Sequence, residues 1–338
     1  MEQHSRKETT TENPLEVRGQ QPSGTETRFQ IVRPEMTEAK HMKAVSRVVV
    51  RHAQAMAREL GAAAVLVLAD AVEGDDELRQ LVRTVNFRTI LISRTREMPP
   101  TCDLPHCEWV TVPNVPMTRT GQVKIALLVC LAKGMLQRGD RVVCLTGIDG
   151  SNMIDTSLVL NLGSEPELFS VLDTVRVGSD VSPAVFERTL TIATQLAVEG
   201  REGRPVGAIF VVGDSEHVLL QSRPLVLNPF HGYPEEARNI LDPAVEDTIK
   251  EFAAIDGAFI VRGDGVMLTA GSQLLPTAPP PQLASGLGTR HAAAAAITAS
   301  TEAVSLAVSQ STGTVTLFKS GQMITDIHKP ANGGRLTI

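Results

Sequence analysis

Two short stretches in the C-terminal half of the chain combine residue types that suit phosphate chemistry. The first, "GLGTRH" at residues 286–291, precedes a run of alanines that is typical of a helix. Glycines such as Gly288 leave backbone N–H groups accessible, Thr289 can cap the helix, and Arg290 can bind phosphate oxygens near the positive end of the helix dipole. His291 adds a titratable ring. The pattern predicts a phosphate-binding helix start; the alternative is a loop whose arginine pairs with a carboxylate.

The second stretch, Asp256-Gly257-Ala258, places a carboxylate at the start of an expected strand, beside a residue without a side chain. Such an arrangement lets a ligand approach the backbone while the acid faces it. Asp-Gly is also a common turn dipeptide, and on its own the stretch favours an ordinary turn. A strand end and turn at residues 309–313 could supply a third wall of the same site.

The surrounding segments predict a mixed β-sheet flanked by helices. Ser182, Pro183 and Gly200 delimit an amphipathic helix as N-cap, first helical residue and stop. We expect a hairpin from "GAIFVVGD" and "HVLL", a helix from "DPAVEDTIKEFAAI", and a second hairpin from "DGAFIVRGDGVMLTAGSQL" that turns at residues 263–265. The strands "AVSLAVSQ" and "TVTLFKSGQ" follow the alanine-rich helix.

The N-terminal half alternates helices with short buried strands, which predicts an α/β domain with a mostly parallel sheet. Its turns at Asp70, Ser93 and residues 147–150 follow strands, so we expect them at the carboxyl ends of the sheet, where such folds bind ligands. This half has no G-x-G-x-x-G sequence and no P-loop. That favours ordinary loops of a structural or dimerising domain over a ligand site.

Composition narrows the functional classes. The chain has 338 residues, which suffices for two domains with separate cores, and a formal net charge of −6. The acidic balance argues against a broad nucleic-acid-binding surface, and one Trp and one Tyr argue against a base-stacking platform. No segment reaches the roughly 18–20 apolar residues of a membrane span, and a signal peptide is not evident. We expect a soluble, cytoplasmic protein with neither membrane nor nucleic acid as a partner.

Metal ligands elsewhere in the chain are not predicted. Cys102 and Cys107, with His106 between them, do not complete a zinc signature, and four scattered cysteines fit a reducing cytosol. Asp149 and Asp155 could bind a metal, but loop carboxylates of acidic proteins are usually solvated.

The C-terminal motifs, taken in order and spacing, resemble the diadenylate cyclase domain, whose hallmarks are a DGA motif and an RHR motif. The resemblance is carried by "DGAFIVRGDGVMLTAGSQL", "GLGTRHAAAAAIT" and "AVSLAVSQSTGTVTLFKSGQ", with "GAIFVVGD" similar to the early hairpin of the family. It covers residues 180–328. The resemblance implies a nucleotidyltransferase that joins two ATP molecules into cyclic di-AMP, releases two pyrophosphates, uses Mg or Mn, and works as a homo-oligomer with two protomers face to face.

The same resemblance implies roles for individual residues. Asp256 would bind the metal and help to activate the ribose 3′-hydroxyl, while Arg290 and His291 would act on the triphosphate. Leu274 would pack against adenine. The implied nucleotide site comprises Gly257, Ala258, Leu274, Gly288, Thr289, Arg290, His291, Ser309, Gln310 and Ser311.

Two departures from the family pattern leave an alternative open. Ala292 stands where the RHR motif has its second Arg, and Gln310 stands where many members carry a carboxylate. A catalytically weak or inactive nucleotide-binding sensor of the same fold is therefore the alternative function. A third class, the DNA-scanning members, is not favoured, because no helix-hairpin-helix or basic segment follows the last hairpin before Ile338.

The N-terminal half resembles the C-terminal domain of pyruvate kinase over residues 40–166, in order and spacing of elements and without a catalytic motif. Together the two halves resemble the archaeal-type soluble diadenylate cyclases. We expect a disordered tail at residues 1–40, a pyruvate-kinase-C-like α/β domain at 41–168 that senses a signal or oligomerises, and a cyclase domain at 180–330. The ending "HKPANGGRLTI" is expected to be an extension without a further element.

Overall fold

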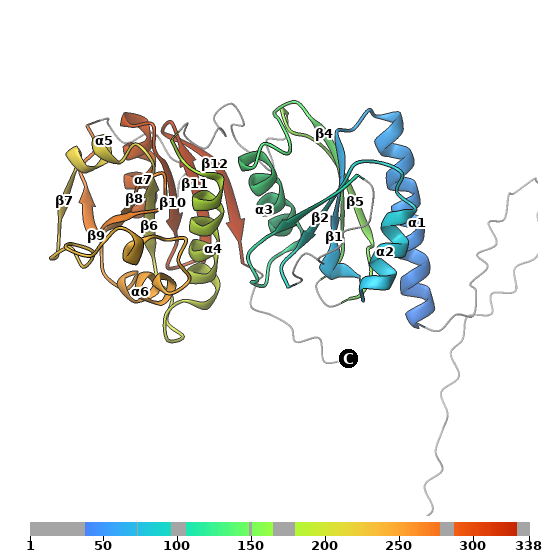
Figure 1. Ribbon diagram of the computed structural model, residues 1–338, viewed down its shortest axis with the longest axis horizontal. Helices are drawn as coiled ribbons and strands as arrows, with labels where there is room; N and C mark the ends of the chain where they lie inside the picture. Colours follow the sequence, from blue (N-terminus) through green and yellow to red (C-terminus); the bar gives the residue numbers. More distant parts are fainter. Residues whose placement is uncertain are drawn as a thin grey trace, which may run out of the picture. The chain divides into compact units, whose positions relative to one another are not determined.

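The computed structural model describes residues 38–72, 74–95, 106–148, 151–164, 180–277 and 287–329. Within these ranges the chain forms a five-stranded and a seven-stranded β-sheet, each with helices on both faces (Figure 1). This architecture confirms the predicted fold class of two α/β parts. Cys102, Asp149 and nearly all of the expected tail lie outside the described residues.

The first sheet has the strand order β3-β2-β1-β4-β5. Its strands β1 to β4 are parallel and β5 is antiparallel, which confirms the predicted mostly parallel sheet. The strands are β1 (Ala64–Leu68), β2 (Thr89–Ser93), β3 (Cys107–Thr111), β4 (Arg141–Thr146) and β5 (Thr156–Asn161). Helices α1 (Glu38–Glu59) and α2 (Asp75–Arg83) cover one face and α3 (Arg119–Ala132) covers the other (Figure 1).

Local sequence explains these elements. Strand β1 is "AVLVL" and is buried along its whole length, as expected for a central strand that has helices on both sides. Helix α2 begins with three acidic residues beside the positive end of its dipole. Helix α3 begins after Thr118, whose hydroxyl accepts a hydrogen bond of 3.0 Å from the amide of Gly121. Strand β3 carries Trp109, whose indole nitrogen is buried and has no hydrogen-bond partner.

The second sheet has the strand order β12-β11-β10-β6-β8-β9-β7. Neighbouring strands are antiparallel except for the parallel pair β6 and β8, so the predicted mixed sheet is confirmed. The strands are β6 (Ala208–Val212), β7 (Ser222–Pro224), β8 (Ala258–Val261), β9 (Met267–Leu274), β10 (Val304–Val308), β11 (Thr314–Lys319) and β12 (Gln322–His328).

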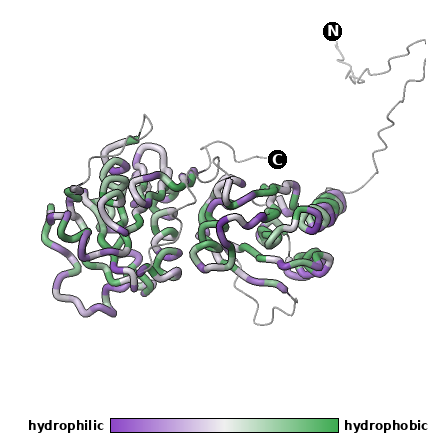
Figure 2. Tube along the Cα trace, turned by 90° about the horizontal axis from the view of Figure 1, so that it is seen from above, coloured by the Kyte–Doolittle hydropathy of each residue, from purple (hydrophilic) through white to green (hydrophobic). Residues whose placement is uncertain are grey.

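Helices lie on both faces of this sheet. The apolar cores place α4 (Pro183–Glu199) and α6 (Val245–Phe252) on one face, and α5 (Ser215–Leu220) and α7 (Thr289–Ser300) on the other. Helix α4 begins after Ser182 with Pro183 in first position and ends at Gly200, as the sequence predicts. The outer helix α1 alternates between hydrophilic and hydrophobic bands, as expected of an amphipathic helix (Figure 2).

One sequence prediction in this part is wrong, and one strand was not predicted. The segment "HVLL" lies in helix α5 rather than in a hairpin with β6, because both edges of β6 are already paired, with β10 and with β8. Strand β12 was not predicted; it ends at His328, the first residue of "HKPANGGRLTI", and from residue 330 this ending lies outside the described residues. That strand satisfies the free edge of β11, to which it is paired from residue 314 to residue 319.

Helix α3 contacts both sheets. The described residues from Glu38 onward form one compact unit, in which α3 packs against the first sheet and also against α4 and β12. Lys124 of α3 is almost fully buried and donates hydrogen bonds to the carboxylate of Asp326 in β12 at 2.7 Å and to its backbone carbonyl at 2.9 Å. A buried lysine with both contacts satisfied fixes α3 against this strand.

Candidate functional site

Helix α7 begins at the "GLGTRH" stretch. Gly288 occupies the N-cap position and Thr289 is the first helical residue, so the prediction that the Thr289 side chain caps the helix is wrong. An N-cap without a side-chain acceptor leaves amide N–H groups of the first turn available to a ligand. Behind this turn, Ala294, Ala295 and Ile297 pack into the apolar core under the sheet. The alanines thus allow α7 to lie close to the sheet with its start exposed.

Arg290 and Asp256 form an ion pair at this helix start. The guanidinium of Arg290 donates to a carboxylate oxygen of Asp256 at 2.8 Å. The Asp256 side chain is 86% exposed and that of Arg290 is 33% exposed. The structure therefore brings the two predicted stretches together, although they lie 34 residues apart in sequence. Both partners remain accessible to a ligand.

Gly207 provides the space for Arg290 and was not predicted from the sequence. A Cβ atom at this position would lie 2.8 Å from a guanidinium nitrogen of Arg290 and 3.1 Å from the Cβ atom of Gln310. The only signal in the sequence was a glycine directly before the buried strand β6. This signal does not indicate which side chain approaches the glycine.

Gly257 is a glycine for a different reason than the one predicted. It has a φ of 117°, and a Cβ atom there would lie 2.5 Å from the backbone of Gly271 in β9. The neighbouring strand, rather than a ligand, occupies this space. Asp256 lies two residues before Ala258, the first residue of β8, and Ala258 is buried, so the acid stands at the start of a strand as expected.

A cleft of about 490 Å³ opens beside the start of α7. Seven of the predicted site residues line it together: Gly288, Thr289, Arg290, His291, Ser309, Gln310 and Ser311. Asp256 joins them through its ion pair with Arg290. Leu274 does not line this cleft among the described residues; it lies in an apolar cluster with Ala258 and Ile260. Its contact with adenine stays a prediction.

The far wall of the cleft contains polar residues that sequence reasoning missed. They come from β11 and β12, and they are Thr314, Thr316, Asp326 and His328. The Nε2 atom of His328 lies 2.8 Å from an Asp326 oxygen, and its Nδ1 atom lies 3.2 Å from the Thr314 hydroxyl. The alternation in "QMITDIH" predicts a strand and was the available signal.

Burial gives His291 and Arg290 different electrostatic roles at the start of α7. The His291 side chain is buried, with its ring edge-to-face against Phe318 at 6.2 Å, and desolvation lowers its pKa below the ordinary value of 6.5. The imidazole is therefore largely neutral at pH 7. Arg290 and the first-turn amides of α7 supply the positive potential at the mouth of the cleft.

Asp326 is held as a carboxylate on the opposite wall. Burial acts to raise its pKa, but the hydrogen bond and charge of Lys124 together with His328 outweigh it, so that the pKa lies below the ordinary value of 3.8. Asp326 thus carries its charge in the whole neutral range and links the cleft wall to α3.

Comparison with known proteins shows which family this chain belongs to. The family model "DisA bacterial checkpoint controller nucleotide-binding" matches residues 195–323, and the model "Probable sensor domain DacZ_P" matches residues 46–169. A diadenylate cyclase from Haloferax volcanii is 34% identical over 204 residues, which cover 60% of this chain and 72% of the relative. The chain belongs to the diadenylate cyclase family.

Two further similarities extend this result. A diadenylate cyclase from Methanocaldococcus jannaschii is 34% identical over 199 residues, or 59% of this chain; the matched region spans 63% of that relative, slightly less than two thirds of its length. The crystal structure of DacA from Staphylococcus aureus covers 42% of this chain and 86% of its own at 24% identity and a TM-score of 0.28, a value too low to carry an argument. The pyruvate kinase resemblance and the domain boundaries stay predictions.

The two departures from the family motifs have a defined structural setting. The Gln310 side chain donates a hydrogen bond of 3.2 Å to the backbone carbonyl of Pro205, so it ties down the loop before β6. The hydroxyls of Ser309 and Ser311 lie 3.3 Å apart beside it. Ala292 follows the motif on α7 and contributes no charge. Positions 292 and 310 therefore carry a methyl group and an amide, and neither side chain adds a charge to the cleft.

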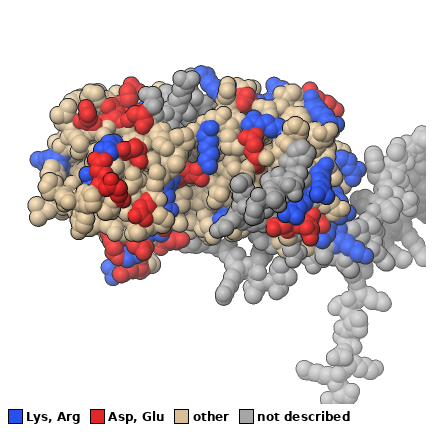
Figure 3. All heavy atoms as spheres, in the orientation of Figure 1, with Lys and Arg blue, Asp and Glu red and all other residues tan. Residues whose placement is uncertain are grey.

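The distribution of exposed charges fits a small charged site at the cleft rather than an extended surface of one charge. On the face shown in Figure 3, Lys and Arg side chains are interspersed with Asp and Glu side chains among the residues that are coloured. Asp155, considered as a metal ligand, instead pairs with Arg119 at 2.6 Å, and the described residues contain no group of three or more acidic, His or Cys side chains arranged to hold a metal. In the described part of the chain, helices are too short or too polar to cross a membrane.

Proposed function

We propose that this protein is a diadenylate cyclase that condenses two ATP molecules into cyclic di-AMP and two pyrophosphates. The observation that carries the proposal is the accessible Arg290–Asp256 pair at the start of α7, beside a cleft of about 490 Å³. Membership in the diadenylate cyclase family supports it. In each half-reaction the 3′-oxygen of one ATP bonds to the α-phosphorus of the other, the bond from that phosphorus to pyrophosphate breaks, and the hydroxyl proton passes to solvent.

The positive end of α7 would bind the triphosphate. Arg290 can exchange its exposed carboxylate partner for phosphate oxygens at small cost, because solvated ion pairs contribute little. The bidentate guanidinium and the first-turn amides then stabilise the charge that develops as pyrophosphate leaves. His291 contributes a hydrogen bond rather than a charge, because its imidazole is largely neutral. Ser309, Gln310 and Ser311 would contact the phosphates from the opposite loop.

Asp256 would orient the ribose 3′-hydroxyl once Arg290 has turned to phosphate. The donor set fits Mg²⁺ or Mn²⁺, since an accessible carboxylate with hydroxyls nearby is what such ions use together with substrate phosphates, rather than a cage made by the protein alone. When bound, the ion would make the 3′-hydroxyl more acidic. Gly257 keeps Asp256 at the strand end, and Leu274 would form the apolar side toward adenine.

Two protomers are needed for this chemistry. One cleft holds one ATP, and closing a two-fold symmetric product requires a second ATP in the same geometry, so the active form is a homo-oligomer with cyclase faces opposed. We propose a cytoplasmic location, because ATP, the proposed substrate, is abundant there. Residues 41–168 and 180–330 serve as sensor and cyclase domains in this proposal.

The decisive experiment incubates the full-length protein with ATP and either Mg²⁺ or Mn²⁺ and resolves products by liquid chromatography. Cyclic di-AMP and pyrophosphate are expected from the wild type but not from Asp256→Asn. If ATP binds but is not converted to product with either metal, the proposal is wrong and the non-catalytic sensor is favoured. That alternative is considered because Ala292 and Gln310 are neutral. Sedimentation velocity under the same conditions tests the oligomer.

A further inference from the structure

Three polar side chains meet at one end of β11 and β12, the two strands that form the far wall of the cleft. The register pairs Thr314 of β11 with His328 of β12, and Asp326 lies two residues before His328. Side chains alternate between the two faces of a strand, so these three lie on the same face. The strand positions therefore bring a hydroxyl, an imidazole and a carboxylate together, and all three line the cleft.

Hydrogen bonds join these groups in one direction. The Thr314 hydroxyl accepts a hydrogen bond of 2.9 Å from Thr312, so it can donate its own hydrogen to Nδ1 of His328 at 3.2 Å. A neutral ring that accepts at Nδ1 carries its proton on Nε2, which lies 2.8 Å from a carboxylate oxygen of Asp326. A single ring orientation therefore satisfies both neighbours of His328.

Lys124 of α3 is the buried end of this series. Its ammonium group donates to the second carboxylate oxygen of Asp326 at 2.7 Å, and it does not line the cleft. The exposed fraction of the side chain rises from 8% in Lys124 to 33% in Asp326 and 59% in His328. Breaking a buried ion pair leaves an uncompensated charge, so the Lys124 end is the fixed one. We call the five linked side chains the β12 network: Lys124, Asp326, His328, Thr314 and Thr312.

The other end of the β12 network is the turn at residues 309–313. Within this turn the Ser309 hydroxyl accepts a hydrogen bond of 3.3 Å from the amide of Thr312, and the Ser309 carbonyl accepts one of 2.9 Å from the amide of Gly313. A Cβ atom on Gly313 would lie 2.7 Å from the side chain of Lys329, which follows β12. The turn is therefore closed by its own hydrogen bonds and is covered by the residue after β12.

We propose that His328 is a positioning residue for this turn, and that Lys124 holds His328 in place through Asp326. The inference rests on the proposed function, in which residues 309–311 contact the phosphates of ATP. These residues are neutral, so they bind phosphate through hydrogen bonds, which weaken steeply when their geometry is lost. The β12 network thus allows a helix of the first sheet to control the affinity of the cleft for ATP.

Binding is tested with 3′-deoxy-ATP and Mg²⁺, because this analogue lacks the hydroxyl that the proposed reaction uses. Calorimetry on the full-length protein is expected to show a dissociation constant raised about 5- to 10-fold in His328→Phe, which loses both hydrogen bonds of the ring. Lys124→Met is expected to weaken binding by a similar factor, although Lys124 does not line the cleft. Gln322→Ala, at the exposed opposite end of β12, is the matched control and should bind as the wild type does.

The double variant Lys124→Met/His328→Phe tests whether the two residues act in one network. Either substitution interrupts the same series of hydrogen bonds, so the double variant is expected to bind about as weakly as His328→Phe alone, whereas independent effects would multiply. Multiplied effects, or an unchanged affinity in Lys124→Met, would overturn the inference. If Lys124→Met does not fold, Asp326→Asn takes its place in the cycle, because it keeps the shape of the side chain and removes the charge that both neighbours contact.

Kinetics of cyclic di-AMP formation separate positioning from a general loss of structure. His328→Phe is expected to raise KM for ATP about 5- to 10-fold and to keep kcat within about twofold, because the turn binds the phosphates before and during the reaction. A loss in kcat that follows a lowered melting temperature would overturn the positioning role. If the wild type binds 3′-deoxy-ATP but makes no product from ATP, the proposed function is wrong, and the affinities alone decide on the β12 network. If the wild type does not bind the analogue, both proposals are wrong.

Discussion

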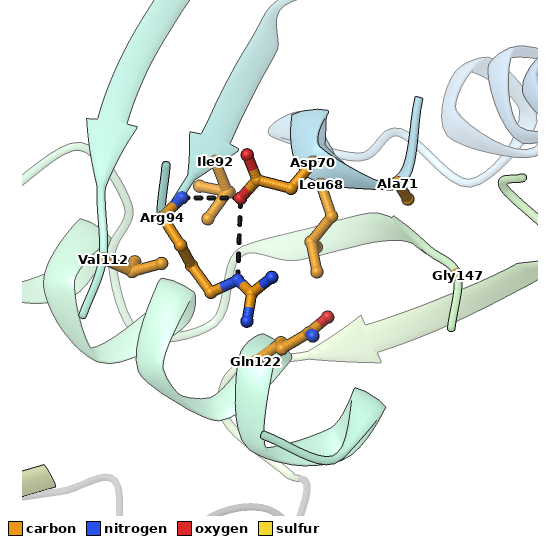
Figure 4. Close-up of a pocket in the computed structure, with 8 residues that line it drawn as sticks. All are labelled: Leu68, Asp70, Ala71, Ile92, Arg94, Val112, Gln122 and Gly147. Atoms are coloured by element: carbon orange, nitrogen blue, oxygen red, sulfur yellow. Dashed lines mark hydrogen bonds and ion pairs between the residues drawn. The ribbon is translucent and has the colours of Figure 1, made fainter. Parts of the chain in front are cut away.

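The cleft beside α7 and the small pocket at the carboxyl ends of β1, β2 and β4 (Figure 4) hold their polar groups in opposite ways. In the cleft, the side chain of Asp256 is exposed, that of Arg290 is partly exposed, and the two pair with each other. In the pocket, the side chains of Asp70 and Arg94 are nearly buried and bonded to backbone and hydroxyl groups. An exposed ion pair exchanges partners at a lower cost than a buried one, so the second sheet presents the more adaptable groups.

The largest expected effect concerns the exposed acid. Asp256→Asn removes the carboxylate while it preserves the shape, and the cyclase rate is expected to fall about 10²–10³-fold or more, a range typical for the loss of one group that stabilises a transition state. Product formation measured by liquid chromatography checks this. The melting temperature should stay unchanged because the side chain is 86% exposed. Full activity with an intact fold would remove Asp256 from the mechanism and end the contrast.

Two glycines test the difference in packing directly. A Cβ atom on Gly147 in the first sheet would lie 1.9 Å from the backbone oxygen of Met153, whereas one on Gly288 at the cleft would meet nothing within 4 Å. Gly147→Ala is expected to destabilise the protein by about 2 kcal/mol or more, within the range of severe substitutions, and Gly288→Ala by about 1 kcal/mol or less, because alanine is a poorer N-cap than glycine. Urea unfolding of both variants checks this; equal midpoints would contradict it.

Substitutions of Arg290 test whether the cleft needs only a positive charge or also the paired N–H donors of a guanidinium. Arg290→Lys keeps the charge but loses bidentate geometry, and kcat/KM is expected to fall about tenfold, with a larger loss for Arg290→Met. Steady-state kinetics of the two variants make the measurement. If Lys and Met were equivalent, the helix dipole alone would hold the phosphates, and the guanidinium would have no part in the reaction.

The smallest effect is a dependence of stability on pH. The folded-state pKa of His291 lies below its unfolded value of 6.5 because burial disfavours the charged ring, so the unfolded chain binds the proton more tightly. Stability is therefore full above pH 6.5 and is lost as the pH falls from that value through the folded pKa. Melting temperatures from pH 8 to pH 5 should decline less in His291→Phe than in the wild type; parallel curves would contradict this.

The sequence predicted the elements better than it predicted the contacts between them. Periodicity located β6 and β8 to β11 of the second sheet but not β7 or β12, and in the first sheet it located β1, β2 and β4 but not β3 or β5. Punctuation at Ser182 and Gly200 placed α4. It also identified Asp256 and Arg290, because an acid at a strand start and a cation at a helix start are local patterns. The positions of Gly207 and Asp326 depend on strand order and on the contact of α3 with β12, which no local pattern contains. "HVLL" failed because a short apolar run does not distinguish a helix from a strand.

The position of Trp109 gives the protein a built-in optical probe. The chain has one Trp and one Tyr; Trp109 lies in β3 of the first sheet with its indole nitrogen buried, and Tyr233 lies 61% exposed between β7 and α6. Tryptophan emission therefore originates entirely from the first sheet, and Trp109 does not line the cleft beside α7. Any spectral change on adding ATP would have to travel through the protein, so unlabelled fluorescence can record communication between the two sheets in real time.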